Sequence, residues 1–366
     1  MTAARIANID GLRFIAAVAV IVFHFAYRGT PAHEMPDLDL PAWLIGMAKY
    51  GYLGVSLFFI ISGFVITYSA AGRTPIAFAV ARFCRLYPTY VLAMTVTFFA
   101  TMFWGGAQFS TSLSQYAANL TMFSPAFGQP FMDGAYWSIV LEVAFYAWVF
   151  VLLWLGIFDK WQLTVVVVWL AVSIVLELVL DITAFQNILL TEYAGFFAAG
   201  ILFFRLHSGD RRWSVWLLLV VSYAFSIAAT LKGLAWLEAT YSDRFSPVTV
   251  IVVLTLEYAL FAAAAFGKRA LLRPASLATL GALTYPAYLL HQYVGYIAFW
   301  HLSGWLPGWV QLLAVVLAML TLAWLIWYLV ERPLVPWLRH KLTSLISQDL
   351  QTFFRRLRLQ TRAESA

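Results

Sequence analysis

Three ionisable residues lie inside long apolar stretches of the sequence, where such groups are costly and usually functional. They are His24, Glu142 and His291. Arg13 precedes His24 by eleven residues, so on a helix both side chains share one face and lie about 16 Å apart along the axis. A neutral imidazole can accept the proton of a hydroxyl group. Counted from the ends of their helices, the three residues reach similar depths, and we expect them to line one buried cavity.

A pair of arginines lies at the start of a later apolar stretch. Arg82 and Arg85 are three residues apart, so they lie on the same side of one helical turn. Two guanidinium groups in this arrangement suit bidentate phosphate binding. The alternative is an anchor that contacts lipid headgroups. Cys84, the single cysteine, is interpreted as packing rather than as a nucleophile, and no metal-binding motif is found, so we expect no metal site.

The composition indicates which kind of fold positions these residues. Of 366 residues, 63% are hydrophobic and 11% are charged, whereas ordinary soluble domains have about 25% charged residues. This composition excludes a soluble enzyme, a disordered chain and a disulfide scaffold. Continuous apolar runs of about 20 residues are typical of membrane-spanning helices rather than of barrel strands. We therefore predict an all-α transmembrane bundle of ten spans, over residues 14–30, 51–71, 86–104, 136–157, 162–180, 187–205, 213–231, 247–266, 276–300 and 309–330.

Basic residues predict the orientation of the bundle. With both termini in the cytoplasm, all but four of the 23 Lys and Arg residues fall on the cytoplasmic side, as the positive-inside rule requires. The exceptions are Arg28, Lys49, Lys232 and Arg244. We expect a transmembrane domain over residues 1–335 and a basic amphipathic cytoplasmic tail over 336–366. The net charge of +6 is explained by this topology and does not indicate nucleic-acid binding.

Six motifs, spread from end to end of the chain, resemble those of the membrane-bound acyltransferase-3 family and occur in the family's order. They are Ile9–Phe14 with His24, Gly54–Phe64, Arg82–Pro88, Tyr136–Ser138 with Glu142 and Tyr146, Leu280–Tyr285 with Tyr288–His291, and Glu331–Pro333. Two positions depart from the family pattern. Ser56 stands where the family frequently has Asp, so no acid is expected there, and Thr284 stands where Ser is frequent.

The resemblance implies an O-acyltransferase of the exopolysaccharide and O-antigen type in a bacterial inner membrane. An acyl group, expected to be acetyl, would pass from cytoplasmic acyl-coenzyme A to a hydroxyl of an envelope or exported polysaccharide or of a lipid-linked oligosaccharide, with no permanently bound cofactor. The residues carried over from the motifs are His24, Glu142 and Arg13 for catalysis, Arg82, Arg85 and Tyr87 for the donor, and Ser138, Trp137, Tyr146, Tyr285 and His291 for the acceptor or cavity.

Several alternatives stay open at this point. His24 either acts as a general base in a ternary complex, which we favour, or is transiently acylated. The acceptor is either a sugar or a small molecule of the antibiotic type. Ten helices with polar groups in mid-span also describe a transporter, although the sequence shows no inverted repeat and no paired broken helices. A purely structural membrane protein is the remaining class.

Overall fold

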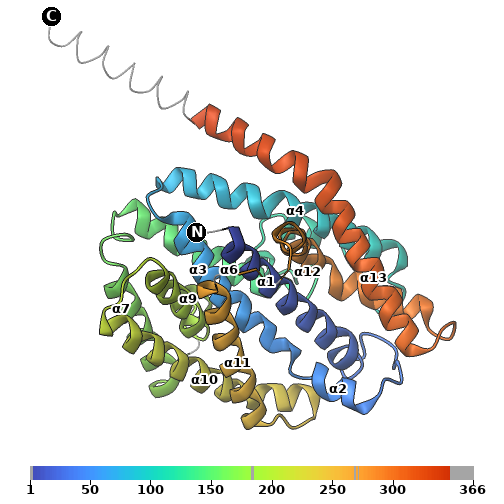
Figure 1. Ribbon diagram of the computed structural model, residues 1–366. Helices are drawn as coiled ribbons and strands as arrows, with labels where there is room; N and C mark the ends of the chain where they lie inside the picture. The colour runs from blue at the N-terminus through green and yellow to red at the C-terminus, as the bar shows by residue number, and fades with distance from the viewer. Residues whose placement is uncertain (1–2, 183–184, 268, 271, 347–366) are drawn as a thin grey trace, which may run out of the picture.

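The computed structural model is built almost entirely of helices (Figure 1). It describes residues 3–182, 185–267, 269–270 and 272–346, and within these residues it contains no strand. The predicted all-α fold is therefore confirmed. The α-helices are α1 (Ala3–Phe23), α2 (Ala42–Ala48), α3 (Gly54–Ala70), α4 (Pro75–Trp104), α5 (Leu113–Asn119), α6 (Tyr136–Trp154), α7 (Gln162–Ile174), α8 (Gln186–Leu189), α9 (Ala194–His207), α10 (Trp213–Tyr241), α11 (Pro247–Phe266), α12 (Pro274–Leu302) and α13 (Gly308–Ile326).

Two of the long helices begin at the same local signal. Thr74 precedes α4 and Ser246 precedes α11, and each side chain accepts a hydrogen bond from the backbone amide three residues on. Pro75 and Pro247 occupy the first helical positions, where the missing amide hydrogen costs nothing and the fixed φ suits the helix. The starts of both helices are thus encoded locally.

Nine helical segments in the described part of the chain are long and apolar enough to cross a membrane. They correspond to nine of the ten predicted spans, and a polytopic bundle is thereby confirmed. The tenth predicted span, 276–300, is α12, which is long enough at 29 residues but is not among the segments apolar enough to cross a membrane. This helix carries buried polar groups, including Thr284, His291 and Gln292, because it runs through the interior of the bundle.

Helices α1, α3, α9 and α12 form the centre of the bundle, with the closest packing between α3 and α9 and between α1 and α12 (Figure 1). Gly63 of α3 and Gly200 of α9 face each other, and a Cβ atom on either would collide with the backbone of the other helix. Small residues at such a crossing let two helix backbones approach closely, as in other membrane bundles. This contact holds α3, which contributes to both cavities described below.

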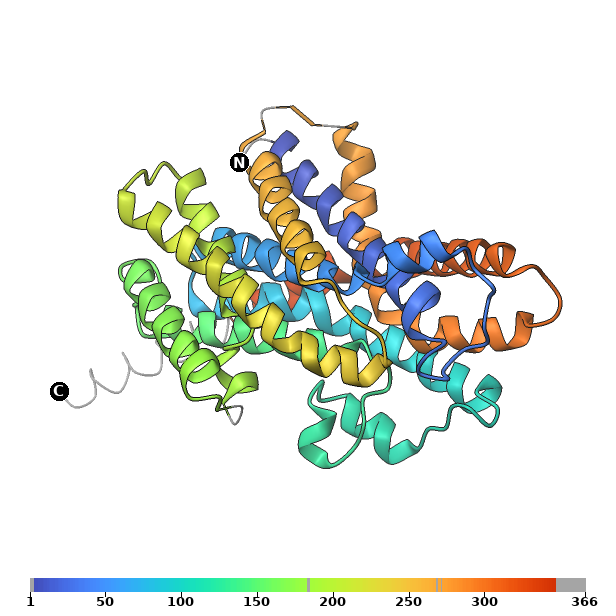
Figure 2. The same cartoon turned by 90° about the horizontal axis from the view of Figure 1, so that it is seen from below.

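Helix α12 bends in its middle, where it contains Pro286 (Figure 2). In a regular helix the Tyr293 amide would donate to the Leu289 carbonyl. Here the Tyr293 amide donates to the Asp133 carboxylate at 2.9 Å, and the Tyr136 hydroxyl donates to the Leu289 carbonyl at 3.1 Å. The side chains of Asp133, just before α6, and of Tyr136, its first residue, therefore bind the backbone of α12 between Leu289 and Tyr293.

Three short π-helical segments interrupt or extend the α-helices. They are η1 (His24–Arg28), η4 (Val175–Val179) and η5 (Trp327–Glu331). Each contains an ionisable residue that contacts the interior: His24, Glu177 and Glu331. Such single turns often mark functional sites, because the wider turn redirects a side chain.

The last helix continues beyond the predicted membrane domain. After η5 the chain stays helical to Ile346, with no break near residue 335. The amphipathic tail expected over 336–366 thus begins inside a continuous helix, and residues 347–366 lie outside the described part of the chain. The tail stays a prediction.

Candidate active site

A cavity of about 850 Å³ contains His24 on its wall. Segments η1, η2 (Gly51–Leu53), η4, α8 and α10 and parts of α3 and α12 surround it. Its polar lining includes the carboxylates Glu177, Asp181 and Glu192, and its aromatic lining includes Trp137 and Trp236. We call this space the outer cavity, after the side on which the sequence predicts it to lie.

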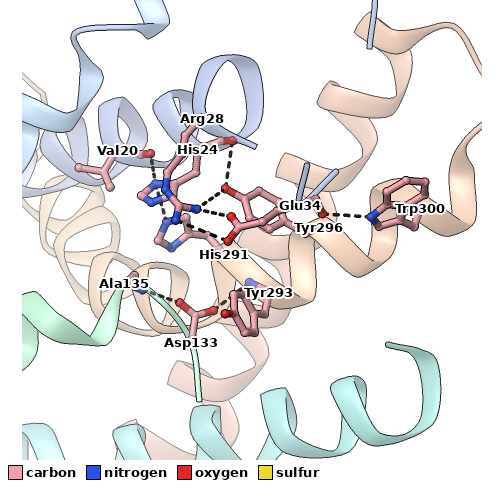
Figure 3. A network of polar contacts seen from close by, with 10 residues as sticks. All are labelled: Val20, His24, Arg28, Glu34, Asp133, Ala135, His291, Tyr293, Tyr296 and Trp300. Carbon is pink, nitrogen blue, oxygen red and sulfur yellow. Dashed lines mark hydrogen bonds and ion pairs between the residues drawn. The ribbon is translucent and has the colours of Figure 1, made fainter. Parts of the chain in front are cut away.

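His24 contacts His291 directly (Figure 3). His24 Nδ1 lies 2.8 Å from the Val20 carbonyl oxygen, and His291 Nδ1 lies 2.7 Å from the Tyr288 carbonyl oxygen. A carbonyl only accepts, so these partners assign the proton to Nδ1 in both rings. His24 Nδ1 has a single hydrogen, so His291 Nε2, at 3.2 Å, is a second and more distant acceptor that shares it with the Val20 carbonyl. The assignment leaves the lone pair of His24 on Nε2, which is the atom required of a base.

An ion pair and several hydrogen bonds connect the segment that carries His24 to α12. Arg28 pairs with Glu34, and its guanidinium also lies 3.3 Å from the Tyr296 hydroxyl (Figure 3). That hydroxyl donates to the His24 carbonyl at 3.3 Å, and Trp300 donates to the Glu34 carbonyl at 3.0 Å. The π-helical turn that carries His24 is thus tied to the second half of α12.

The turn of α12 that carries His291 has a carboxylate beside it. Asp133, which holds the Tyr293 amide, also accepts from the Ala135 amide at 2.9 Å and has no exposed surface (Figure 3). Burial raises the pKa of the Asp133 carboxyl to about 7, although the two backbone donors oppose that rise. Asp133 therefore supports His291 without lining either cavity.

A second cavity, of about 330 Å³, lies between α1, α3, α4, α6 and α12. We call it the inner cavity. Four arginines contribute to its wall, whereas Glu142 is the single carboxylate among its lining residues. The arginines are Arg13, Arg82, Arg85 and Arg339. This excess of positive charge in a partly enclosed space favours an anionic ligand.

The two arginines of α4 have different surroundings. Arg82 lies over the ring of Tyr146, 5.9 Å from its centroid, and its Nε atom is buried without a hydrogen-bond partner among the residues that the structure describes. Arg85 forms an ion pair with Glu331, whose side chain is 4% exposed. Arg82 therefore has a donor available for a ligand, whereas Arg85 also neutralises a buried carboxylate.

The two cavities share part of their walls. Val55 of α3 and Tyr288 of α12 line both. The Tyr288 hydroxyl pairs with Ser138 at 2.7 Å, and Phe58 packs against the Tyr288 ring edge-on. Val55 and Tyr288, which we call the partition, thus separate the arginine-lined cavity from the one that contains His24.

The expectation that His24, Glu142 and His291 line one cavity is wrong: of these three residues only His24 lines the outer cavity. His291 contacts His24 but is fully buried and lines neither cavity. Glu142 lines the inner cavity, where it accepts hydrogen bonds from Tyr146 and from Ser62. Rise along a helix gives depth only when the helices are parallel, and it does not tell which way a side chain points. Glu142 therefore does not orient His24.

The other predicted residues are divided between the two cavities. Arg13, Arg82, Arg85, Ser138, Tyr146 and Tyr285 line the inner cavity, and Trp137 lines the outer one. Tyr87 lines neither: its hydroxyl donates to the Leu120 carbonyl and its ring stacks on Phe83. Tyr87 is two residues beyond Arg85, which places it about 200° around the helix and away from the arginines.

Several lining residues were not predicted. Lys232 contacts the Glu177 carbonyl and Asp181, each at 2.6 Å, and Gln186 donates to the Glu177 carboxylate at 2.9 Å. These residues come from the middle of the chain, where no motif was found, although charged groups near predicted spans are a usable signal. Arg339 was assigned to the tail and Gln292 was not considered.

Comparison with known proteins identifies the family. The family model described as an acyltransferase domain, that of the acyltransferase-3 family, matches residues 6–328. Acyltransferase MdmB of Streptomyces mycarofaciens is 30% identical over 93 residues, and peptidoglycan O-acetyltransferase OatA of Listeria monocytogenes is 27% identical over 176 residues. These matches cover 25% and 42% of this chain and 23% and 25% of those proteins, so the chain spans about a quarter of their length.

Nodulation protein 10 of Rhizobium leguminosarum is 26% identical, over 94% of this chain and 96% of that protein. No solved structure matches the chain. The family match includes the central helices, the outer cavity, the partition and the inner cavity apart from Val335 and Arg339. This membrane protein therefore belongs to the acyltransferase-3 family.

Proposed function

We propose that the protein is an O-acyltransferase of the bacterial inner membrane. It moves an acyl group, most simply acetyl, from cytoplasmic acyl-coenzyme A to a hydroxyl of an envelope or exported polysaccharide sugar. One observation carries this proposal: an arginine-lined cavity and a cavity with a histidine base meet at Val55 and Tyr288. Phosphate binding and proton abstraction are the two tasks that the reaction requires.

The inner cavity suits the donor. Arg82, Arg339 and Arg13 supply guanidinium groups without a carboxylate ion-pair partner among the described residues, and these suit the phosphates of coenzyme A. The pantetheine arm then extends toward the partition, since its length is comparable to the axial distance from Arg13 to His24. The thioester carbonyl comes to lie near Tyr288, within reach of an acceptor on the other side.

The outer cavity suits a sugar. Its volume lies in the range of about 300–1,000 Å³ that is typical of small-molecule sites. Carboxylate oxygens accept from hydroxyl groups, and Trp137 and Trp236 offer flat apolar faces for a sugar ring. The relative named peptidoglycan O-acetyltransferase supports a carbohydrate acceptor.

The residues perform the transfer in a ternary complex. The acceptor oxygen attacks the thioester carbonyl carbon while His24 Nε2 takes its proton. The tetrahedral intermediate collapses as the carbon–sulfur bond breaks, and the coenzyme A thiolate leaves. The proton on His24 then passes to the thiolate, so that an ester and free coenzyme A are the products. His291 accepts from His24 Nδ1 and stabilises the imidazolium that forms.

Binding of acetyl-coenzyme A to the purified protein in detergent tests the donor site. Calorimetry should show micromolar binding that weakens about 10- to 100-fold in an Arg82→Ala variant, because a charge-assisted hydrogen bond is lost. Arg211→Ala, at an exposed position between α9 and α10, is the control and should bind like the wild type. Arg82 is preferred to Arg85, whose removal would leave Glu331 unpaired.

Transfer of labelled acetyl groups to envelope polysaccharide tests the chemistry. His24→Ala should abolish transfer while acetyl-coenzyme A still binds. Transfer at the wild-type rate by this variant would exclude the general-base role. Absence of acetyl-coenzyme A binding by a folded wild-type protein would exclude this donor and favour the transporter alternative.

A further inference from the structure

Gln292 is a buried polar residue whose amide is unused. It is 1% exposed, and neither its Oε1 nor its Nε2 atom has a hydrogen-bond partner in the described part of the chain. A buried amide without partners costs free energy, and most buried side-chain polar atoms are satisfied. Gln292 lines the outer cavity, so the missing partners can come from a ligand there.

The surroundings of Gln292 hold its amide at the wall of this cavity. Gly134 also lines the cavity, and a Cβ atom at position 134 would lie 2.7 Å from Gln292 Nε2 and 2.9 Å from Oε1. Glycine thus leaves the space that the amide occupies. The residue before Gln292 is His291, which contacts His24. The amide therefore lies at the wall of the cavity that holds the proposed base.

The hydrogen-bonding capacity of Gln292 Nε2 and Oε1 indicates which ligand group would pair with them. An oxyanion would use Nε2 and leave Oε1 without a donor. A hydroxyl group both donates and accepts, so a pair of neighbouring hydroxyls satisfies both ends of the amide. The Tyr52 hydroxyl, which lines the same cavity, is also buried without a partner. A polyhydroxylated ligand suits both residues.

We infer that Gln292 binds the acceptor. Its Nε2 donates to one sugar hydroxyl and its Oε1 accepts from a neighbouring one, which presents an adjacent hydroxyl to His24. This inference rests on the proposed function and defines its acceptor as a sugar with vicinal hydroxyl groups. Gly134 is a positioning residue that acts through Gln292.

Steady-state kinetics of the full-length protein in membranes test this role. The acceptor probe is envelope polysaccharide of the producing strain, stripped of esters by mild alkali and supplied at varied concentration with labelled acetyl-coenzyme A. Gln292→Leu should raise the apparent acceptor KM about tenfold and leave the donor KM unchanged, since two neutral hydrogen bonds are lost. Gly134→Ala should change the acceptor KM in the same direction.

Gln311→Leu is the matched control. Gln311 is also buried, at 5% exposed, and its Oε1 atom has no partner, but it lines neither cavity. Gln311→Leu should keep the wild-type acceptor KM. A raised KM in Gln292→Leu alone would then come from lost acceptor binding and not from the loss of a buried amide in general.

Two results would overturn the inference while the proposed function stands. One is an unchanged acceptor KM in Gln292→Leu. The other is a lower kcat at unchanged acceptor KM, which would assign the amide to the oxyanion. In contrast, if the wild-type protein transfers no more acetyl than His24→Ala does, the proposed function itself is wrong. Acetyl-coenzyme A binding by each variant shows that it is folded.

Discussion

Replacement of His291 by phenylalanine tests the arrangement of the two histidines. When His24 takes a proton, its Nδ1–H group becomes a charged donor, so the 3.2 Å hydrogen bond to His291 Nε2 strengthens in the transition state. A hydrogen bond to a charged group contributes about 1.5–3 kcal/mol. The neutral hydrogen bond already contributes about 0.5–1.5 kcal/mol in the ground state, so only the difference, about 1–1.5 kcal/mol, slows the chemical step. Since about 1.4 kcal/mol corresponds to tenfold in rate, we expect kcat of His291→Phe to fall roughly 5- to 12-fold at unchanged KM.

The assay is transfer of labelled acetyl groups by membranes that contain equal amounts of folded protein. His291→Gln retains an acceptor atom and should recover part of the loss. His301→Phe is the control, because His301 lies on the same helix but is exposed, with its Nε2 atom 3.1 Å from the Trp104 carbonyl oxygen. A wild-type kcat in His291→Phe, or an equal loss in His301→Phe, would refute the reasoning.

Three further predictions follow from the same contacts. Arg85→Ala should lower the free energy of unfolding by about 3 kcal/mol in a detergent melt, because Glu331 stays buried and unpaired, and added Glu331→Gln should restore it. Because the pKa of Asp133 is raised, its contribution to stability is full below about pH 4 and disappears as the pH rises through about 7, so the melting temperature should fall across this window in the wild type but not in Asp133→Asn. Val55→Trp should fill the space between the two cavities and reduce acetyl transfer more than tenfold, while acetyl-coenzyme A binding, measured by calorimetry, is kept.

The helices were the most predictable part of the fold. Long apolar runs need no tertiary information to be identified as spans, because the bilayer sets their length. The predicted span over 276–300 shows that motif and length together identify even a polar interior helix such as α12. The eleven-residue spacing predicted that Arg13 and His24 are separated along one helix, and they line different cavities. Their depth in the membrane stays a prediction.

The site was only partly predictable, because side-chain direction depends on packing. Glu142 was expected to line one cavity with His24, but Ser62 and Tyr146 hold it in the inner cavity. The ion pair between Arg85 and Glu331 joins residues 246 positions apart, and no local pattern gives that contact. The π-helical turn at His24 also has no composition signal, since it depends on the contacts around it.

The partition has a consequence for the electrical state of the membrane. In the proposed orientation the inner cavity faces the cytoplasm and the outer cavity faces the other side, so Val55, Tyr288 and their neighbours form the insulating layer between them. Much of the membrane potential then falls across this layer. In the proposed reaction a positive imidazolium forms on the outer side and a negative thiolate on the inner side. An inside-negative potential opposes this separation by up to about 2.3 kcal/mol per charge and 100 mV. Acyl transfer in energised vesicles should therefore be slower than in vesicles whose potential has been collapsed.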